Sequence, residues 1–145
     1  MAERVIILTG PPGAGKSTAA AALVSRSRAR AAAHLHSDDF FDYIAHGFIK
    51  PWLPESADQN RAISHALAAA ACAYAQGGIE VVMDGVVGPW FLDIYRLIAA
   101  DTRTELHYVV LRPDLETAVV RARDRIKSPL SDYPPRIYEG LAHLG

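Results

Sequence analysis

The chain has 145 residues, a length that suits one domain with a sizeable core. Half of its residues are hydrophobic and 21% are charged, which is ordinary for a soluble globular protein. The formal net charge is −1, so no global positive field recruits nucleic acid or an acidic membrane. No apolar stretch reaches the length of a membrane-spanning helix. We therefore expect one domain, residues 1–145, with neither a nucleic-acid partner nor a membrane partner.

The cysteine content and the N-terminus both predict a cytoplasmic protein. The one cysteine, Cys72, lies in an alanine-rich run and has no second thiol with which to form an internal disulfide. Glu3 and Arg4 precede only a brief apolar run, so this stretch does not have the composition of a signal peptide. Neither observation predicts an oligomeric state.

The strongest motif is the glycine-rich loop at residues 10–17, which reads G-P-P-G-A-G-K-S and fits the phosphate-binding pattern G-x-x-x-x-G-K-[ST]. The apolar and β-branched segment 5–8 before it predicts a buried parallel strand. The alanine-rich segment 17–24 after it predicts a helix. A glycine turn that matches by chance would lack this context. The motif therefore predicts a site for a nucleoside triphosphate, for which we expect ATP.

The chemistry of the loop explains its spacing. Gly13 and Gly15 lack a Cβ, so the backbone can curl and direct successive N–H groups at phosphate oxygens. The helix that begins near Lys16 adds its positive N-terminal end to the same anion. Lys16 can reach the β- and γ-phosphates, and the Ser17 hydroxyl is placed to bind Mg²⁺. The expected nucleotide-binding residues are Gly10, Pro11, Pro12, Gly13, Ala14, Gly15, Lys16, Ser17 and Thr18.

Short apolar segments alternate with helical segments along the rest of the chain. We predict strands at 5–8, 32–36, 79–83 and 106–111, and helices at 17–30, 59–76, 91–100, 113–126 and 136–144. Asp58 is the expected N-cap of the helix over 59–76, and 42–58 is expected to be a loop with one short helical piece. Such alternation is typical of an α/β fold, a parallel sheet with right-handed crossovers. The sequence thus predicts a three-layer P-loop NTPase fold with four recognisable strands.

Polar residues gather where these predicted strands end. The glycine loop, the pair Asp38 and Asp39, Asp84 and Arg112 each follow a different strand. Ligands of open parallel sheets bind at the carboxyl ends of the strands. We therefore expect these groups to converge on one edge.

With these residues in hand, the chain resembles the small P-loop kinase group of shikimate and gluconate kinases, chloramphenicol phosphotransferase, zeta toxins and nucleoside monophosphate kinases. It is most similar to bacterial AAA-type phosphotransferases of that group. The shared features, in order, are GPPGAGKS, D-D-F after the second strand, D-G-x-x-G-P-W after the third, and L-R-P before an arginine-rich helix. The group usually carries a fifth strand, which is not seen here, so either the chain is C-terminally truncated or this edge strand is missing.

The resemblance implies that Asp38 and Asp39 lie where these kinases keep the acid that receives the proton of the acceptor hydroxyl. We assign Asp38 as the base and Asp39 as a ligand of substrate or of a Mg²⁺-bound water; the alternative is a pair that caps the following helix. Asp84 resembles the metal-binding acid of a Walker B strand or a substrate-binding acid in the same place. Its alternative is a turn residue before Gly85.

The resemblance also implies a lid, about residues 121–135, whose arginines clamp the triphosphate. Arg121 and Arg125 are spaced i, i+4 and share a helix face, which suits the negative charge of a transferring phosphoryl group. The alternative is a solvated helix. A stretch with three prolines, 128–135, is expected to act as the hinge of the lid.

Other side chains have weaker predictions. The six histidines show no metal-ligand spacing and are expected to be packing or surface residues. Trp52 and Trp90 follow prolines in loops and are expected to close the pocket rather than to stack on a ring. The leading function is an ATP- and Mg²⁺-dependent kinase that acts on a hydroxyl of a small molecule. The alternatives are a nucleoside monophosphate kinase of the cytidylate type and a nucleotide-dependent switch or ATP-binding module.

Overall fold

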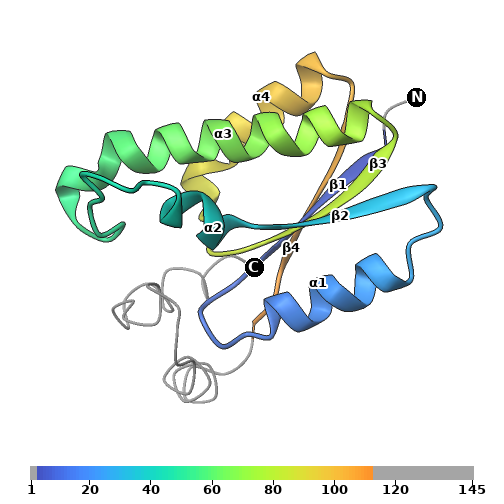
Figure 1. Cartoon of the computed structure of the whole chain (residues 1–145), viewed down its shortest axis with the longest axis horizontal. Helices are drawn as coiled ribbons and strands as arrows, with labels where there is room; N and C mark the ends of the chain where they lie inside the picture. The colour runs from blue at the N-terminus through green and yellow to red at the C-terminus, as the bar shows by residue number, and fades with distance from the viewer. Residues whose placement is uncertain (1–2, 113–145) are drawn as a thin grey trace.

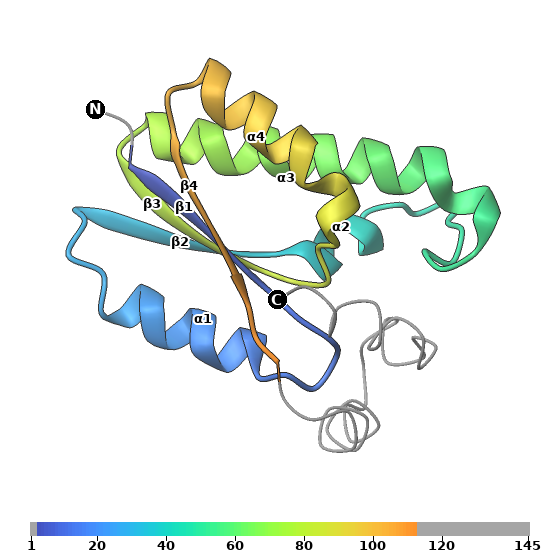
Figure 2. The ribbon, with the colours of Figure 1, turned by 180° about the vertical axis from the view of Figure 1, so that it is seen from behind.

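The structure, a computed structural model, describes residues 3–112 and contains a parallel sheet in the order β2-β3-β1-β4 (Figure 1). Its four strands are β1 (Arg4–Thr9), β2 (Ala31–His36), β3 (Ile79–Asp84) and β4 (Glu105–Val110). Helix α1 covers one face of the sheet, and α3 and α4 cover the other, as both views show (Figures 1 and 2). The predicted three-layer α/β fold with four strands is confirmed.

Three of the described helices lie close to the predicted positions, whereas the short helix α2 was not predicted. They are α1 (Lys16–Ser25), α2 (Ser37–Asp42), α3 (Ala57–Gln76) and α4 (Leu92–Asp101), with 3₁₀ turns at Pro54–Ser56 and Pro89–Phe91. The prediction that Asp58 caps α3 is wrong, because the 3₁₀ turn runs directly into the helix and Asp58 lies in its first turn. Gly78, with φ of 83°, follows the C-cap Gly77 and ends α3, as glycine does in a left-handed C-terminal position.

The two central strands, β1 and β3, are buried on both faces, which is why their sequences read as nearly continuous apolar runs, whereas the edge strands β2 and β4 are only partly buried. Successive residues of a strand point to opposite faces. The residues that pack under α3 and α4 include Val5, Ile7, Val81 and Met83. The residues that pack under α1 are Ile6, Leu8 and Val82, together with Ala20 of the helix itself. Two apolar layers therefore hold the sheet rigid beneath its loops.

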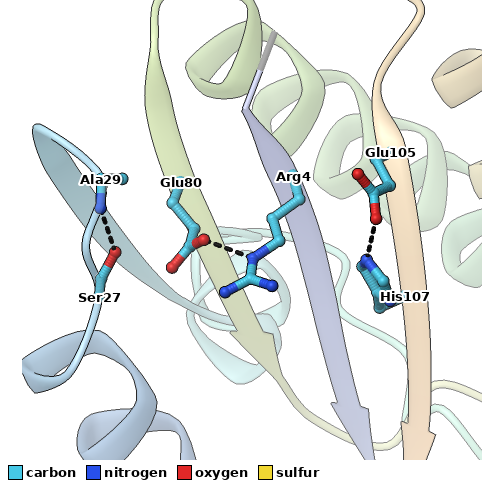
Figure 3. A network of polar contacts seen from close by, with 6 residues as sticks. All are labelled: Arg4, Ser27, Ala29, Glu80, Glu105 and His107. Atoms are coloured by element: carbon cyan, nitrogen blue, oxygen red, sulfur yellow. Dashed lines mark hydrogen bonds and ion pairs between the residues drawn. The ribbon is translucent and has the colours of Figure 1, made fainter.

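A polar network closes the amino end of the sheet on the α1 face (Figure 3). Arg4 Nε lies 2.5 Å from Glu80 Oε2, and Glu80 is buried. Burial alone would raise the pKa of Glu80, but hydrogen bonds from Ser27 and Arg4 and the charge of Arg4 outweigh it and hold the pKa below its ordinary value. On β4, His107 Nε2 lies 2.6 Å from Glu105 Oε1. These contacts lie at the end of the sheet opposite to the glycine loop.

The predicted helices at 113–126 and 136–144, the lid and the question of a fifth strand lie outside the described residues. Across residues 3–112, none of the helices combines the length and the apolar character needed to cross a bilayer.

Candidate active site

The glycine loop leaves β1 and curls back onto the start of α1. Gly10, Gly13 and Gly15 all have positive φ, at 151°, 84° and 86°, and the Ala14 N–H donates to the Pro11 carbonyl at 3.1 Å. A Cβ on Gly10 would lie 2.4 Å from the Leu111 carbonyl oxygen, so the loop start fits closely against the segment that follows β4. The glycines thus allow a turn that side chains would strain or block.

Lys16 and the end of α1 supply the positive character of the loop. Lys16 is only 4% exposed, and its Nζ donates a hydrogen bond of 2.9 Å to the Pro11 carbonyl. Helix α1 begins at Lys16 with Gly15 as its N-cap, and within the described chain no side chain caps it by hydrogen bonding. Its first N–H groups therefore suit an anion such as a phosphate. The half-buried Ser17 lies in the same turn, so a hydroxyl stands beside the expected phosphate site.

Asp38 and Asp39 lie in the first turn of α2, directly after β2. The N-cap of α2 is His36, so the alternative interpretation, in which the aspartates cap the helix, is wrong. Asp38 is half-buried and Asp39 is exposed, a difference that favours Asp38 as the residue facing the site interior. Both carboxylates also suit the positive end of a helix.

A close contact fixes where α2 begins. Gly85 follows β3 with φ of 153°, and a Cβ there would lie 1.6 Å from Ser37 Oγ. Ser37 is buried and comes immediately before Asp38. Because only glycine permits this approach, the end of β3 sets the position of the helix that carries the predicted base.

Asp84 is the last residue of β3 and is 6% exposed. Its Oδ2 forms an ion pair with Nε2 of His34 and lies 3.3 Å from Nδ1 of His36. The six histidines show no metal-ligand spacing in the sequence, but the fold brings nitrogens of these two and the Asp84 oxygen within 4.8 Å of one another. The missed signal is the spacing of His34 and His36, which puts both on one face of a strand.

The loop after β3 is held by three hydrogen bonds from two side chains, Thr9 and Tyr108. Thr9 Oγ1 accepts a hydrogen bond from the Val87 N–H at 2.8 Å and donates to the Val87 carbonyl at 3.0 Å. The Tyr108 hydroxyl donates to the same carbonyl at 2.6 Å. Burial raises the pKa of Tyr108, with an opposing hydrogen bond to Thr9, so the phenol stays protonated and keeps donating. These hydrogen bonds therefore hold the centre of the D-G-x-x-G-P-W motif, residues 84–90, at Val87.

A pocket lies under this loop, between α2, α3 and the start of α4. Its polar lining comes from Ser37, Asn60, Ser64 and Tyr95, and its apolar lining includes Phe41 and Trp90. Among the described residues that line it, none is Lys, Arg, Asp or Glu. The pocket thus offers an uncharged surface with a few hydrogen-bonding groups, a composition typical of small-molecule sites.

The two tryptophans differ in their surroundings. Trp90 lines the pocket, as predicted, and its indole lies so close to Gly88 that a Cβ there would meet the ring at 2.2 Å. Trp52 is not among the described residues that line this pocket, so its role in closing a pocket stays a prediction. Its ring lies instead under Lys50, whose Nζ is 5.8 Å from the ring centroid.

The polar groups that we predicted to converge lie at the carboxyl ends of the four strands, along one edge of the sheet. The loop follows β1, Asp38 and Asp39 follow β2, Asp84 ends β3, and Arg112 follows β4. Backbone hydrogen bonds tie the edge together, from Gly85 N–H to the Leu8 carbonyl at 3.2 Å and from Leu111 N–H to the Thr9 carbonyl at 2.8 Å. Arg121 and Arg125 lie outside the described residues.

Comparison with known proteins gives one family match. The family model AAA_18, described as AAA domain, matches residues 6–133. A search of curated protein sequences finds no match to this chain.

Solved structures share the fold. A sugar kinase from Janibacter sp. HTCC2649 is 18% identical, with a TM-score of 0.69 over 99% of this chain and 78% of that chain. The Mycobacterium tuberculosis APS kinase CysC, solved with AMPPNP and APS, is 22% identical, with a TM-score of 0.63 over 86% and 70%. A chain of the Pnkp1/Rnl/Hen1 RNA repair complex is 19% identical, with a TM-score of 0.70 over 97% of this chain and 43% of that one. This chain therefore spans less than half of the length of that last relative.

Proposed function

This chain belongs to the AAA domain family and has the fold of the small P-loop kinases, and from that premise we propose that it is an ATP-dependent kinase for a hydroxyl of an uncharged small molecule. The observation that carries the proposal is the arrangement at the carboxyl edge of the sheet. A phosphate-binding loop opens α1, and a half-buried carboxylate opens α2 next to a pocket without charged lining.

On the nucleotide side, the backbone N–H groups of the loop and Lys16 hold the β- and γ-phosphates of ATP. Three observations support this role: the positive φ of the loop glycines, the N-terminus of α1 without a side-chain cap in the described chain, and the burial of Lys16 beside them. Mg²⁺, when bound, neutralises charge that develops on the phosphates. Ser17 is its protein ligand in this proposal, and Asp84 supplies the acid of the Walker B type.

On the acceptor side, Asp38 is the general base. Its carboxylate takes the proton of the acceptor hydroxyl as that oxygen forms a bond to the γ-phosphorus, while the bond from the γ-phosphorus to the β–γ bridging oxygen breaks and ADP leaves. Asp39 is exposed and assists as a ligand of substrate or of Mg²⁺-bound water. Arg121 and Arg125 complete the proposal as lid residues that stabilise the equatorial oxygens.

The pocket favours an uncharged acceptor over a nucleoside monophosphate. An enzyme that binds a monophosphate needs cations at the acceptor phosphate, because a buried phosphate without a partner is costly. The described lining of this pocket has hydroxyl and amide groups and no cation. Such groups hydrogen-bond to hydroxyls, so polyols, sugars and hydroxylated natural products are the class of acceptor that fits best.

The decisive experiment measures ADP release from ATP and Mg²⁺ in three arms: no acceptor, a library of uncharged hydroxyl compounds, and nucleoside monophosphates including CMP. The proposal expects stimulation and a phosphorylated product in the second arm. Stimulation only by monophosphates would replace it with the cytidylate-type kinase. Tight ATP binding with slow release in all three arms would replace it with the switch. The matched variants are Asp38→Asn and Asp42→Asn, since both aspartates lie in α2 and only the first is assigned to the reaction.

A further inference from the structure

Two histidines of β2 and the carboxylate that ends β3 form a compact group on the α1 face of the sheet. The strands are parallel neighbours, and their register pairs His34 with Val82 and His36 with Asp84. His34 and His36 are two residues apart, so both side chains leave the same face. Their rings lie against one another, with centroids 4.0 Å apart. The sheet itself, rather than a loop, thus sets the geometry of the group.

Three ligand atoms of this group converge on one point. His34 offers Nε2 and His36 offers Nδ1, and both approach the same oxygen, Oδ2 of Asp84. Ligands bound to one tetrahedral zinc at about 2.0–2.1 Å lie about 3.3 Å from one another. His36 Nδ1 already lies 3.3 Å from Oδ2, and all three ligand atoms lie within 4.8 Å of one another, so a modest approach of the side chains would bring them to one metal.

Burial and access also suit a cation. The Asp84 side chain is 8% exposed, so its charge needs a partner, whereas the His36 side chain is 43% exposed. The group is therefore closed on the carboxylate side and open on the imidazole side. A metal can enter from that side and keep a water as its fourth ligand, as three-ligand zinc sites do.

We propose that His34, His36 and Asp84 bind one transition-metal cation of the zinc type. Two imidazoles and a carboxylate are a donor set for Zn²⁺ and its neighbours, whereas Mg²⁺ takes oxygen ligands and keeps its waters. The site is thus distinct in chemistry from the Mg²⁺ that accompanies ATP, and it goes beyond the proposed kinase function. It shares Asp84 with that function, so the two metals compete for one carboxylate.

The experiment uses the full chain without nucleotide, after treatment with EDTA and dialysis. Zn²⁺ is titrated in competition with a chromophoric chelator, and Co²⁺ is added separately to record its visible absorption. We expect one Zn²⁺ per chain and a tetrahedral Co²⁺ spectrum. Millimolar Mg²⁺ should leave the bound Zn²⁺ in place. Because no ATP is present, this result is independent of whether the chain is a kinase.

The variants separate metal binding from the ion pair. The substitutions His36→Asn and His34→Gln replace the ring nitrogen that faces Asp84 with an amide N–H. The amide can still donate a hydrogen bond to the carboxylate, but it is a poor metal ligand. We expect each to weaken Zn²⁺ binding at least about a hundredfold. His107→Asn is the matched control, since His107 forms a histidine–carboxylate pair with Glu105 on β4 and should leave the affinity unchanged.

Any of these results would overturn the proposal: no Zn²⁺ held at micromolar concentration, wild-type affinity in both variants, or displacement by millimolar Mg²⁺. Thermal unfolding checks that each variant is folded. Should one fail to fold, the wild-type Co²⁺ spectrum decides, because an octahedral spectrum like that of the hydrated ion also contradicts the site.

Discussion

Two buried carboxylates of β3 lie on the same face of the sheet, four residues apart, in very different surroundings. Glu80, at the amino end, is paired with the guanidinium of Arg4, a permanent cation. Asp84, at the carboxyl end, is paired with the imidazoles of His34 and His36, with which we propose that it binds a metal. Both residues belong to β3, point to the same face of the sheet and are buried. They differ in the side chains with which they are paired.

The difference separates stability from function along one strand. Near neutral pH the charge of Glu80 is always compensated by the Arg4 guanidinium. Glu80 therefore stabilises the fold and is not available to bind a ligand. A carboxylate with imidazole partners, next to a phosphate-binding loop, can exchange partners. In parallel sheets the carboxyl end is also where ligands bind. We therefore expect substitutions at the carboxyl end to change turnover, and substitutions at the amino end to change the free energy of unfolding.

The largest expected effect is at Lys16. We expect Lys16→Met to lower ATP turnover at least about a thousandfold, because it removes the charge that stabilises the transferring phosphoryl group. Methionine keeps the buried aliphatic stem, so the melting temperature should change little. The matched variant is Arg4→Met, at the amino end of the sheet. It also removes one positive charge but should keep full turnover. Steady-state ADP release and thermal unfolding of both proteins check this, and turnover in Lys16→Met equal to the wild type would contradict the loop assignment.

The second effect is at Asp38. We expect Asp38→Asn to lower phosphoryl transfer by at least about a hundredfold, the usual scale for the loss of a general base. ATP binding should change far less, because the carboxylate serves the acceptor. Asp42→Asn, at the other end of the same helix, should leave both unchanged. A larger loss in Asp39→Asn would reverse the order of the pair, and no loss in either would remove the base from the mechanism.

The sequence predicts the fold well because the fold depends on local patterns. Apolar runs bounded by glycine and polar residues predict strands such as Ala31–His36 within about a residue, and the loop motif predicts where α1 begins. The carboxyl edge follows from the parallel order of the strands. Motif and order together therefore predict which segments form the candidate site.

What the sequence could not predict depends on register between segments distant in the chain. His36 meets Asp84 because β2 and β3 are neighbours with one specific pairing, which spacing alone does not provide. The same holds for the hydrogen bonds of Thr9 and Tyr108 to Val87. Asp58 is a smaller case: an acidic residue in the first turn resembles a cap in sequence, and only the preceding 3₁₀ turn distinguishes the two.

The third effect is at Gly85, where the carboxyl end depends on a close contact between the Gly85 backbone and the Ser37 side chain. We expect Gly85→Ala to cost about 1–3 kcal/mol of stability, from the strain of its φ and the collision with Ser37. Turnover should fall as well, since Ser37 precedes Asp38. The control is Gly47→Ala, which has φ of 75° and nothing within 4 Å of its added Cβ. It should show the strain without the loss of turnover, in chemical denaturation and ADP release, and equal turnover in the two variants would contradict the contact.

The smallest effect, at the amino end, tests the other half of the comparison. Arg4→Met should cost about 1 kcal/mol, because Glu80 loses a charged hydrogen bond while the half-exposed arginine is partly screened by solvent. The folded-state pKa of Glu80 lies below its ordinary 4.5, so the pair stabilises the fold above that pH. This stability is lost as the pH falls through the folded-state pKa. The difference in the free energy of unfolding between wild type and Arg4→Met, measured with urea, should thus be full at pH 7 and shrink below about pH 4.

A difference that is constant with pH would mean that Arg4 acts through packing of its aliphatic stem. A loss of turnover at pH 7 would mean that the two ends of β3 are not separate in role.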